Sequence, residues 1–131
     1  GPRPPSPGAR VTQMGWEFWP EALELCIRRA SVRTGVPILV SENGVAVADD
    51  RERIEYMERA LRGVRACLDD RIPVQGYVYW SLLDNFEWAF GYGPKFGLVA
   101  VDRTTQARTP RPSAGWLGAV ARANALSAVA P

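Results

Sequence analysis

The chain has 131 residues, a formal net charge of +2 and no histidine. Charges of both signs are interspersed, so no electrostatic footprint points to a nucleic acid, and no apolar run reaches the roughly 20 residues of a membrane span. The absence of histidine excludes Ser-His-Asp and Cys-His catalysis and His-containing zinc sites, and no Gly-rich phosphate or dinucleotide loop is present, so we expect no metal and no cofactor.

The chain begins with a stretch that has no regular pattern. Residues 1–12 are rich in proline and glycine and predict a linker or a loop. A helix is then expected over residues 20–34, because Pro20 suits a first helical turn and Gly35 suits a helix end. Its inward face should carry Leu23, Cys26, Ile27 and Ala30.

A strand and a second helix follow. Residues 38–41 predict a short parallel strand that is buried on both faces. A helix is expected over residues 50–68, with Asp49 and Asp50 available as caps. Its inward stripe should be Ile54, Met57, Leu61, Val64 and Leu68. Its solvated side should be Arg51, Glu52, Arg53, Glu55, Glu58 and Arg62.

The last part of the chain predicts two further strands and a helix. Residues 74–80 form the second strand, and residues 96–101 predict a short extra strand before a turn near residues 102–105. A helix should then run from a Ser113 cap to about Ala123, with Trp116, Val120 and Ala123 facing inward. Residues 125–131 are alanine-rich and predict a frayed tail.

The two cysteines, Cys26 and Cys67, both fall within predicted helices. Small, weakly polar thiols are often buried at such positions, and we expect both to be buried and reduced. Reduced thiols, with no signal-peptide pattern at the start of the chain, favour a cytoplasmic location.

The order of the elements indicates the fold class. Alternating helices and strands predict an α/β fold with parallel strands and right-handed crossovers. Two parallel strands cannot cover both of their faces, because they need helices on one side and more sheet or barrel around them. A complete (β/α)8 barrel has about 250 residues. Residues 13–124 are therefore expected to form a portion of a larger architecture.

An acidic side chain follows the first predicted strand. Glu42 comes directly after residues 38–41 and before an Asn-Gly turn, and a buried carboxylate there is costly unless it is paired or functional. Glu42 could be a nucleophile that forms a glycosyl-enzyme ester. It could equally be a strand-end glutamate that is exposed on a loop or caps the next segment.

The second strand leads into an unusual loop, residues 80–88, with the sequence Trp-Ser-Leu-Leu-Asp-Asn-Phe-Glu-Trp. Indole faces match the C–H faces of sugar rings, and carboxylates accept hydrogen bonds from several hydroxyls. Trp80 and Trp88 could instead be core anchors, and Asp84 could stabilise the loop. The residues alone favour a carboxylate-based sugar site, with Glu42 and Glu87 as candidates for an acid–nucleophile pair.

Several motifs, in this order, resemble glycoside hydrolase family 1, the β-glucosidase-like enzymes. They are Met-Gly-Trp-Glu at 14–17, Ser-Glu-Asn-Gly at 41–44, the whole of residues 80–88, Phe-Gly-Leu-Val-Ala-Val-Asp at 96–102 and Arg-Thr-Pro at 108–110. The resemblance implies that the chain corresponds to the C-terminal portion of a (β/α)8 TIM barrel. That portion comprises the last two strand–helix units and the helix before them.

The resemblance also implies roles for individual side chains. Glu42 would be the nucleophile in a retaining hydrolysis of terminal β-linked hexosides. Glu87 would be a clamp on the outer hydroxyls of the glucose-like ring and not the acid. The remaining substrate-binding residues would be Trp88 as an N–H donor, Trp80 as the floor of the subsite, Phe96 as its lining, Trp16 as the leaving-group platform and Asn43 as a frame for the nucleophile loop.

One motif of the family is absent from this sequence. The Asn-Glu-Pro segment that supplies the general acid/base does not occur in the 131 residues. General acid catalysis typically contributes about 10²–10⁴-fold, so we expect negligible activity from the chain alone. Its partners would be a β-glucoside or related small saccharide and a complementing N-terminal barrel segment. The alternative is a non-catalytic sugar-binding or assembly module derived from the same fold.

Overall fold

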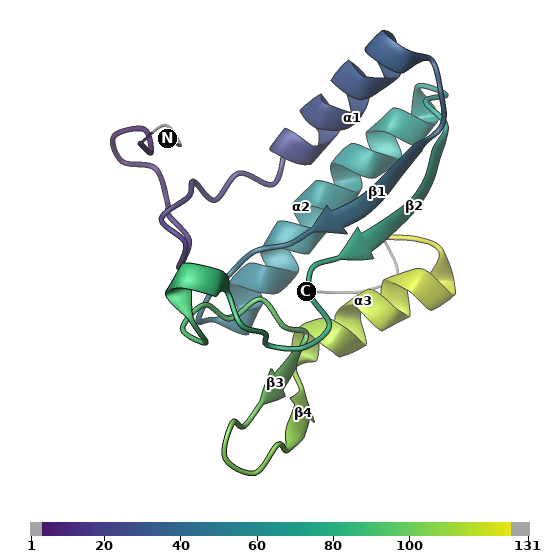
Figure 1. The fold of residues 1–131 in the computed structure, drawn as a ribbon. Helices are drawn as coiled ribbons and strands as arrows, with labels where there is room; N and C mark the ends of the chain where they lie inside the picture. Colours follow the sequence, from purple (N-terminus) through teal and green to yellow (C-terminus); the bar gives the residue numbers. More distant parts are fainter. Residues whose placement is uncertain (1–3, 127–131) are drawn as a thin grey trace.

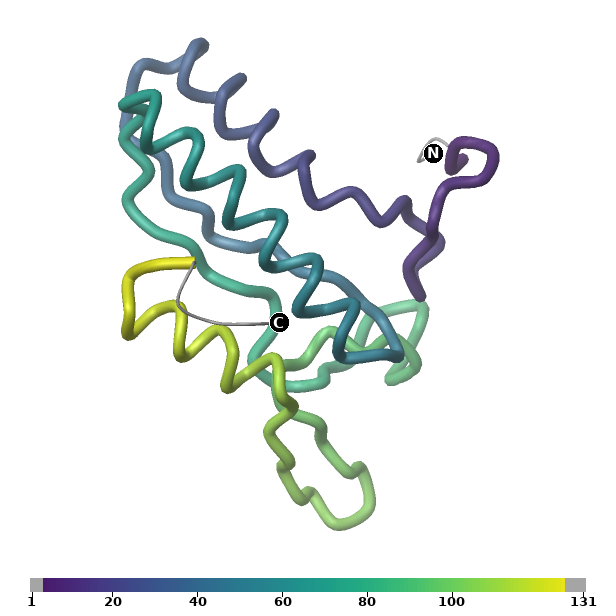
Figure 2. Tube along the Cα trace, turned by 180° about the vertical axis from the view of Figure 1, so that it is seen from behind, coloured from purple at the N-terminus to yellow at the C-terminus, as the bar shows by residue number. Residues whose placement is uncertain are grey.

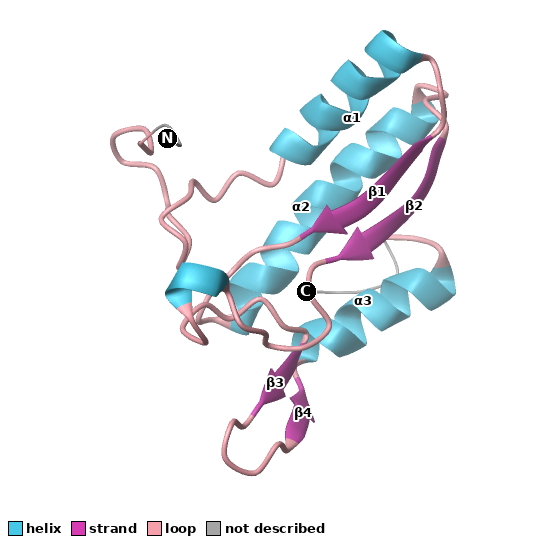
Figure 3. Ribbon diagram, in the orientation of Figure 1, coloured by secondary structure: helices cyan, strands magenta, loops and turns pink. Residues whose placement is uncertain are grey.

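The computed structural model describes residues 4–126. The elements are, in chain order, α1 (Ala22–Thr34), β1 (Ile38–Asn43), α2 (Asp50–Asp69), β2 (Val74–Tyr79), the short 3₁₀ helix η1 (Trp88–Phe90), β3 (Val99–Val101), β4 (Arg108–Pro110) and α3 (Pro112–Ala123) (Figure 1). β1 and β2 form a parallel sheet, and β3 and β4 form a separate antiparallel hairpin (Figure 3). The predicted α/β alternation with parallel strands is confirmed.

Local signals explain where the helices begin and end. Gly35 ends α1 in the left-handed conformation, with φ of 66° and its N–H bonded to the Ser31 carbonyl at 2.8 Å. The side chain of Asp49 caps α2, as predicted. The predicted Ser113 cap is wrong, because α3 already begins at Pro112, whose missing N–H costs nothing in a first turn.

The β1–β2 sheet has one covered face and one open face. α1 and α2 lie side by side against one face, as the views from the front and from behind show (Figures 1 and 2). Val40 is buried on that side in a cluster with Cys67. On the other face Leu39 is 58% and Val78 is 52% exposed, and no described element covers them. The prediction that the first strand is buried on both faces is therefore wrong.

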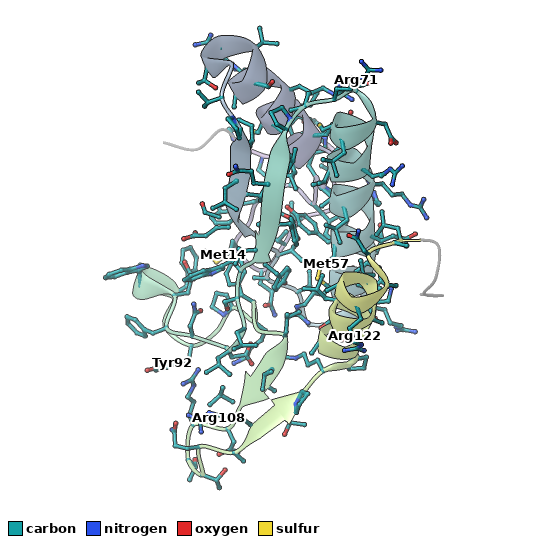
Figure 4. The ribbon with its side chains drawn as sticks, turned by 90° about the vertical axis from the view of Figure 1, so that its right-hand side faces the viewer. Met14, Met57, Arg71, Tyr92, Arg108 and Arg122 are labelled. Carbon is teal, nitrogen blue, oxygen red and sulfur yellow. The ribbon has the colours of Figure 1, made fainter. Side chains whose placement is uncertain are left out.

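A second core joins α2 to α3, to β2 and to the segment before β3. Met57 is completely buried there and contacts Tyr79, Leu98 and Trp116. Figure 4 shows Met57 where α2 approaches α3. Leu126, within the predicted tail, packs against this cluster, and residues 127–131 lie outside the described part of the chain.

Some side chains at the borders of the predicted helical stripes point outward. Cys67 is buried as expected, but Cys26 is exposed, because Ile27 takes the inward position of α1. Leu68, in the last turn of α2, is 45% exposed, and Ala123, in the last turn of α3, is also exposed. These three inward assignments are wrong because a helix that extends past its neighbour has nothing to pack against at its end, and a 3.6-residue period leaves border positions undecided.

The segment around residues 96–101 differs in detail from the prediction. Only Val99–Val101 forms a strand, and it pairs with β4, which was not predicted. The predicted turn near residues 102–105 is confirmed, since Asp102 Oδ1 accepts the N–H groups of Thr104 at 2.9 Å and Thr105 at 2.7 Å.

The stretch predicted as a linker contacts the rest of the fold through Arg10. Its guanidinium pairs with Glu55 of α2 at 3.0 Å and lies 3.4 Å from the centroid of the Phe18 ring.

None of the helices within residues 4–126 combines the length and the hydropathy that a membrane span requires.

Candidate active site

The candidate site lies where β1 and β2 end side by side. Asn43, the last residue of β1, is the register partner of Tyr79, the last residue of β2. The Trp80 N–H donates to the Asn43 carbonyl at 2.9 Å. Asn43 and Trp80 are 37 positions apart along the chain, yet the two predicted motifs to which they belong meet at the same edge of the sheet. This edge is the usual place for an active site in a parallel α/β fold.

An irregular stretch of β1 turns Glu42 toward solvent. In a regular strand successive side chains alternate between the faces, so Glu42 would share the buried side of Val40. The pairing with β2 has a register shift between Val40 and Asn43, and both Ser41 and Glu42 are exposed. Such bulges re-aim side chains next to active sites. The Glu42 carboxylate has no hydrogen bond or ion pair within residues 4–126 and is open to a ligand.

Asn43 points in the other direction, toward the helices. Its Oδ1 accepts the hydroxyl of Tyr77 at 3.0 Å, and its Nδ2 donates to the hydroxyl of Tyr56 on α2 at 3.5 Å. Burial raises the pKa of both phenols, so both stay neutral partners. These contacts fix the side chain of Asn43 between β2 and α2. Its role in framing the nucleophile loop stays a prediction.

Gly44 allows the two strand ends to approach each other closely. A Cβ atom at this position would lie 1.7 Å from the carbonyl oxygen of Trp80. No side chain fits in that space, so the contact between the loops requires Gly44. The predicted Asn-Gly turn is wrong, because Asn43 belongs to β1 and Gly44 does not lie in a turn.

The loop after β2 presents its aromatic residues to different extents. Trp80 is 39% exposed at its base, and Trp88 is 82% exposed on η1. Glu87 is partly buried, and its N–H donates to the Gly91 carbonyl at 2.6 Å. Figure 4 shows Tyr92 farther along this loop, away from Met57 and the core. The exposed indoles and Glu87 are therefore carried on a surface loop.

Phe96 and Trp16 occupy different surroundings. The ring of Phe96 is only 4% exposed, and its carbonyl accepts the hydroxyl of Tyr79 at 3.1 Å, which places it next to the base of the loop. Trp16 is 51% exposed. It lies in a turn where Gln13 bonds to the Ala46 carbonyl at 2.9 Å and to the Lys95 N–H at 2.8 Å, so this turn contacts both strand-end loops. Sugar contacts of Phe96 and Trp16 stay predictions.

A buried arginine, placed on the solvated side of its helix by the sequence pattern, connects the same loops. Arg53 is fully buried, pairs with Asp50, and donates to the carbonyls of Val47 at 3.1 Å and Lys95 at 2.6 Å. Those carbonyls need a donor once they leave water. The prediction for Arg53 is therefore wrong, because both loops bring backbone carbonyls to its position on α2.

Asp84, for which the sequence left a ligand role and a loop-stabilising role open, stabilises the loop. It is 4% exposed and forms a bidentate ion pair with Arg111, with Nη2 to Oδ2 at 2.7 Å. Burial raises the pKa of Asp84, but the hydrogen bonds from Arg111 and from the Gly97 N–H outweigh this effect and hold the pKa below its usual range. No sequence pattern marks this pair.

The described residues form no metal site, and they form a groove that is separate from the predicted site residues. No group of three or more Cys, Asp or Glu side chains lies close enough together to hold a metal ion among residues 4–126. A groove of about 760 Å³ lies between α2 and α3, lined by residues that include Leu61, Tyr77 and Val120. It is on the helix side of β2, and none of the predicted site residues lines it.

Comparison with known proteins gives a consistent set of similarities. A family model described as glycosyl hydrolase family 1 matches residues 5–126. The bifunctional β-D-glucosidase/β-D-fucosidase of Bifidobacterium breve is 40% identical over 119 residues, which cover 80% of this chain and 26% of that protein. β-Glucosidase A of Thermotoga maritima is 36% identical over 125 residues, covering 88% of this chain and 28% of that protein.

Solved structures agree with this result. The apo structure of β-glucosidase 1317 superposes with a TM-score of 0.90 at 55% identity, over 92% of this chain and 30% of that one. The Thermotoga maritima β-glucosidase in complex with glucoimidazole gives a TM-score of 0.85 at 34% identity, over 88% of this chain and 29% of that one. The 131 residues thus span less than a third of the length of the proteins that they match.

Proposed function

Because the chain belongs to glycosyl hydrolase family 1 and its fold is a portion of that family's TIM barrel, we propose that it carries the nucleophile and the sugar-binding loop of a retaining β-glycosidase. The observation that carries the proposal is the arrangement at the strand ends. Glu42 is exposed at the irregularity in β1, and the carbonyl of the next residue, Asn43, accepts the N–H of Trp80, the first residue of the aromatic loop.

The proposed reaction proceeds in two displacements. A carboxylate oxygen of Glu42 bonds to the anomeric carbon while the glycosidic C–O bond breaks, and the leaving oxygen takes a proton from a general acid. Water then attacks the anomeric carbon of the glycosyl ester and gives its proton to the same group, and the Glu42 carboxylate is released. The acid/base belongs to the Asn-Glu-Pro motif of the family, which these 131 residues do not contain.

The sugar ring is bound by the loop after β2. The hexose rests on the indole of Trp80, while Glu87 accepts hydrogen bonds from outer hydroxyls and Trp88 donates from its indole N–H. In this division of roles Glu87 binds the sugar and is not the general acid. A retaining pair needs carboxyls about 5–5.5 Å apart. Because α1 and α2 cover one face of the sheet, the general acid must reach Glu42 from the open face.

We further propose that the rest of a family 1 barrel covers that open face. Leu39 and Val78 are half-exposed there, and β1 pairs only with β2 among the described residues, so each strand has a free edge. The buried Oδ1 of Asn85 also has no donor within residues 4–126. A barrel segment with further parallel strands supplies both the missing sheet pairing and the apolar cover.

The alternative is a sugar-binding module that does not hydrolyse. One observation favours it: Trp80, Glu87 and Trp88 all lie on this chain, whereas the Asn-Glu-Pro motif does not. Binding and hydrolysis can therefore be separated by experiment.

The test uses the full chain and the part of Thermotoga maritima β-glucosidase A that lies outside the matched region. Each is assayed alone and mixed, with 4-nitrophenyl β-glucoside as substrate. We expect background rates from each part and turnover from the mixture that Glu42→Gln abolishes. Turnover that survives Glu42→Gln contradicts the nucleophile assignment, and sugar binding without turnover in the mixture supports the alternative.

A further inference from the structure

Asp84 is the buried point of an otherwise open loop. Between Leu82 and Trp88 it is the one buried residue, whereas Leu82, Phe86 and Trp88 are 65%, 54% and 82% exposed.

At the tip, the rings of Phe86 and Tyr92 pack edge to face with centroids 5.3 Å apart, and the Glu87 N–H donates to the Gly91 carbonyl, so these contacts lie within the loop itself. The guanidinium of Arg103 lies over the Tyr92 ring. The bonds that join the loop to the core are made at its middle.

Asp84 is held by side-chain and backbone bonds together. Arg111 donates from Nη1 to Oδ1 at 3.1 Å and from Nη2 to Oδ2 at 2.7 Å, and the Gly97 N–H donates to Oδ1 at 3.0 Å. The Asp84 N–H donates to the Val99 carbonyl at 3.1 Å, and Arg103 donates to the Asp84 carbonyl. Both carboxylate oxygens are occupied inside the protein, so Asp84 does not itself bind a sugar hydroxyl.

The other end of the ion pair is attached to the core. Arg111 is the residue before α3, and its N–H donates to the Leu98 carbonyl at 2.8 Å. In the first turn of α3, the N–H and the hydroxyl of Ser113 both donate to Asp50 at 2.8 Å. Asp50 belongs to α2, so the pair joins the open loop to the covered side of the molecule.

The approach between the loop and the segment before β3 is as close as backbone atoms allow. A Cβ atom at Gly97 would lie 2.3 Å from the backbone nitrogen of Asp84. The middle of the loop is therefore fixed by the ion pair, by the backbone bonds and by this close contact.

We propose that Asp84 and Arg111 are positioning residues that hold Glu87 and Trp88 in place for the sugar ring. This inference rests on the proposed function, in which those two residues bind the ring. A bidentate guanidinium–carboxylate pair fixes orientation as well as distance. Displacement of a binding group by about 1 Å can cost a site about 100-fold in rate, so a loop with an exposed tip needs such an anchor.

The first test does not depend on turnover. The full chain is labelled with ¹⁵N, and the indole N–H resonances of its five tryptophans are assigned with Trp→Phe variants. Asp84→Asn should shift and broaden the resonances of Trp80 and Trp88 and leave that of Trp116, in the core, unchanged. Asp69→Asn, which removes an exposed pair with Arg65, is the matched control and should change none of them.

A second variant separates positioning from general folding. Arg111→Lys keeps the charge but loses the planar fork, so it should give a weaker form of the same pattern. Equal changes at all five indoles in both variants overturn the proposal, as does no change in either. A wild-type spectrum in which Trp116 is dispersed but Trp80 and Trp88 are not also overturns it, because the loop would then be unpositioned in a folded chain.

The second test uses the mixture with the Thermotoga maritima barrel part. Asp84→Asn should raise KM for 4-nitrophenyl β-glucoside by about 10- to 100-fold with a smaller effect on kcat, and Asp69→Asn should leave both within about twofold. An unchanged KM in an active mixture overturns the positioning role. A wild-type mixture without turnover contradicts the proposed function instead, and the indole spectra still decide between positioning and general folding.

Discussion

The covered and open faces of the β1–β2 sheet carry side chains of the same kind in opposite surroundings. Val40 on the covered face is 6% exposed and packs against α1 and α2, whereas Val78 on the open face is 52% exposed. The networks that hold the loops, through Arg53 and through Arg111, lead back to the covered side. The difference shows that the described residues support the strand-end loops from one side only; on the proposed function, the rest of a family 1 barrel covers the other side.

The largest expected effect is on the rate of hydrolysis and comes from Glu42, near the end of β1. Glu42→Gln in the mixture with the complementing barrel part should lower kcat by roughly 10⁴–10⁶-fold, as removal of a nucleophile does elsewhere. The thermal midpoint should stay the same, because Glu42 has no partner within the described residues. Nitrophenol release and a melting curve check both halves of this expectation.

The next effect is on stability and belongs to the covered side. Arg53→Leu should lower the free energy of unfolding by roughly 3 kcal/mol, since it removes the donor to the Val47 carbonyl, one donor to the Lys95 carbonyl and the ion pair of Asp50. Arg62→Leu, which removes an exposed pair with Glu58 on the same helix, is the matched control and should cost at most about 0.5 kcal/mol. Urea titration gives both values, and equal losses would show that burial of Arg53 is unimportant.

A pair of identical substitutions compares the two faces directly. Val40→Ala should cost roughly 2 kcal/mol through lost burial and a cavity, whereas Val78→Ala should cost less than about 0.5 kcal/mol in the chain alone. With the complementing barrel part present, the cost of Val78→Ala should rise toward that of Val40→Ala. A constant, small cost at Val78 in both conditions would mean that the partner does not cover this face.

The smallest expected effect is the dependence of stability on acid. Burial raises the pKa of Asp84, but Arg111 and the Gly97 N–H lower it by more, so its folded value lies below its unfolded value of about 3.9. The stability that this group contributes is present above pH 4 and is lost as the pH falls through the folded value. The free energy of unfolding should therefore fall below about pH 4 in the wild type, and it should fall less in Asp84→Asn. The difference between the two curves is the measure, because the pKa values of Glu21, Glu55, Asp49 and Asp102 are lowered too.

The order of elements and the edge where the site lies could be predicted from the sequence. Gly35, Asp49 and the apolar stripe through Met57 are local signals, and local signals decide helix limits and strand direction. Glu42 and Trp80 were predicted to lie at strand ends, and parallel pairing then places them at one edge. The predictions for Cys26, Leu68 and Ala123 failed because these residues lie at the borders of helical faces. The burial of such residues depends on where a neighbouring element stops.

The polar contacts could not be predicted, because their partners are far apart along the chain. Arg53 lies among charged residues that face water, and only the arrival of the Val47 and Lys95 carbonyls makes its burial favourable. Asp84 and Arg111 are separated by 27 positions and lie in no common pattern. The turn of Glu42 toward solvent depends on a register shift, which no property of the β1 sequence indicates.

The absence of a side chain at Gly44 limits how this site can evolve. Any other residue there would push the Trp80 carbonyl away, so the spacing between the ends of β1 and β2 is closed to variation. On the proposed function, a lineage that changes its preferred hexose must therefore do so through residues other than Gly44.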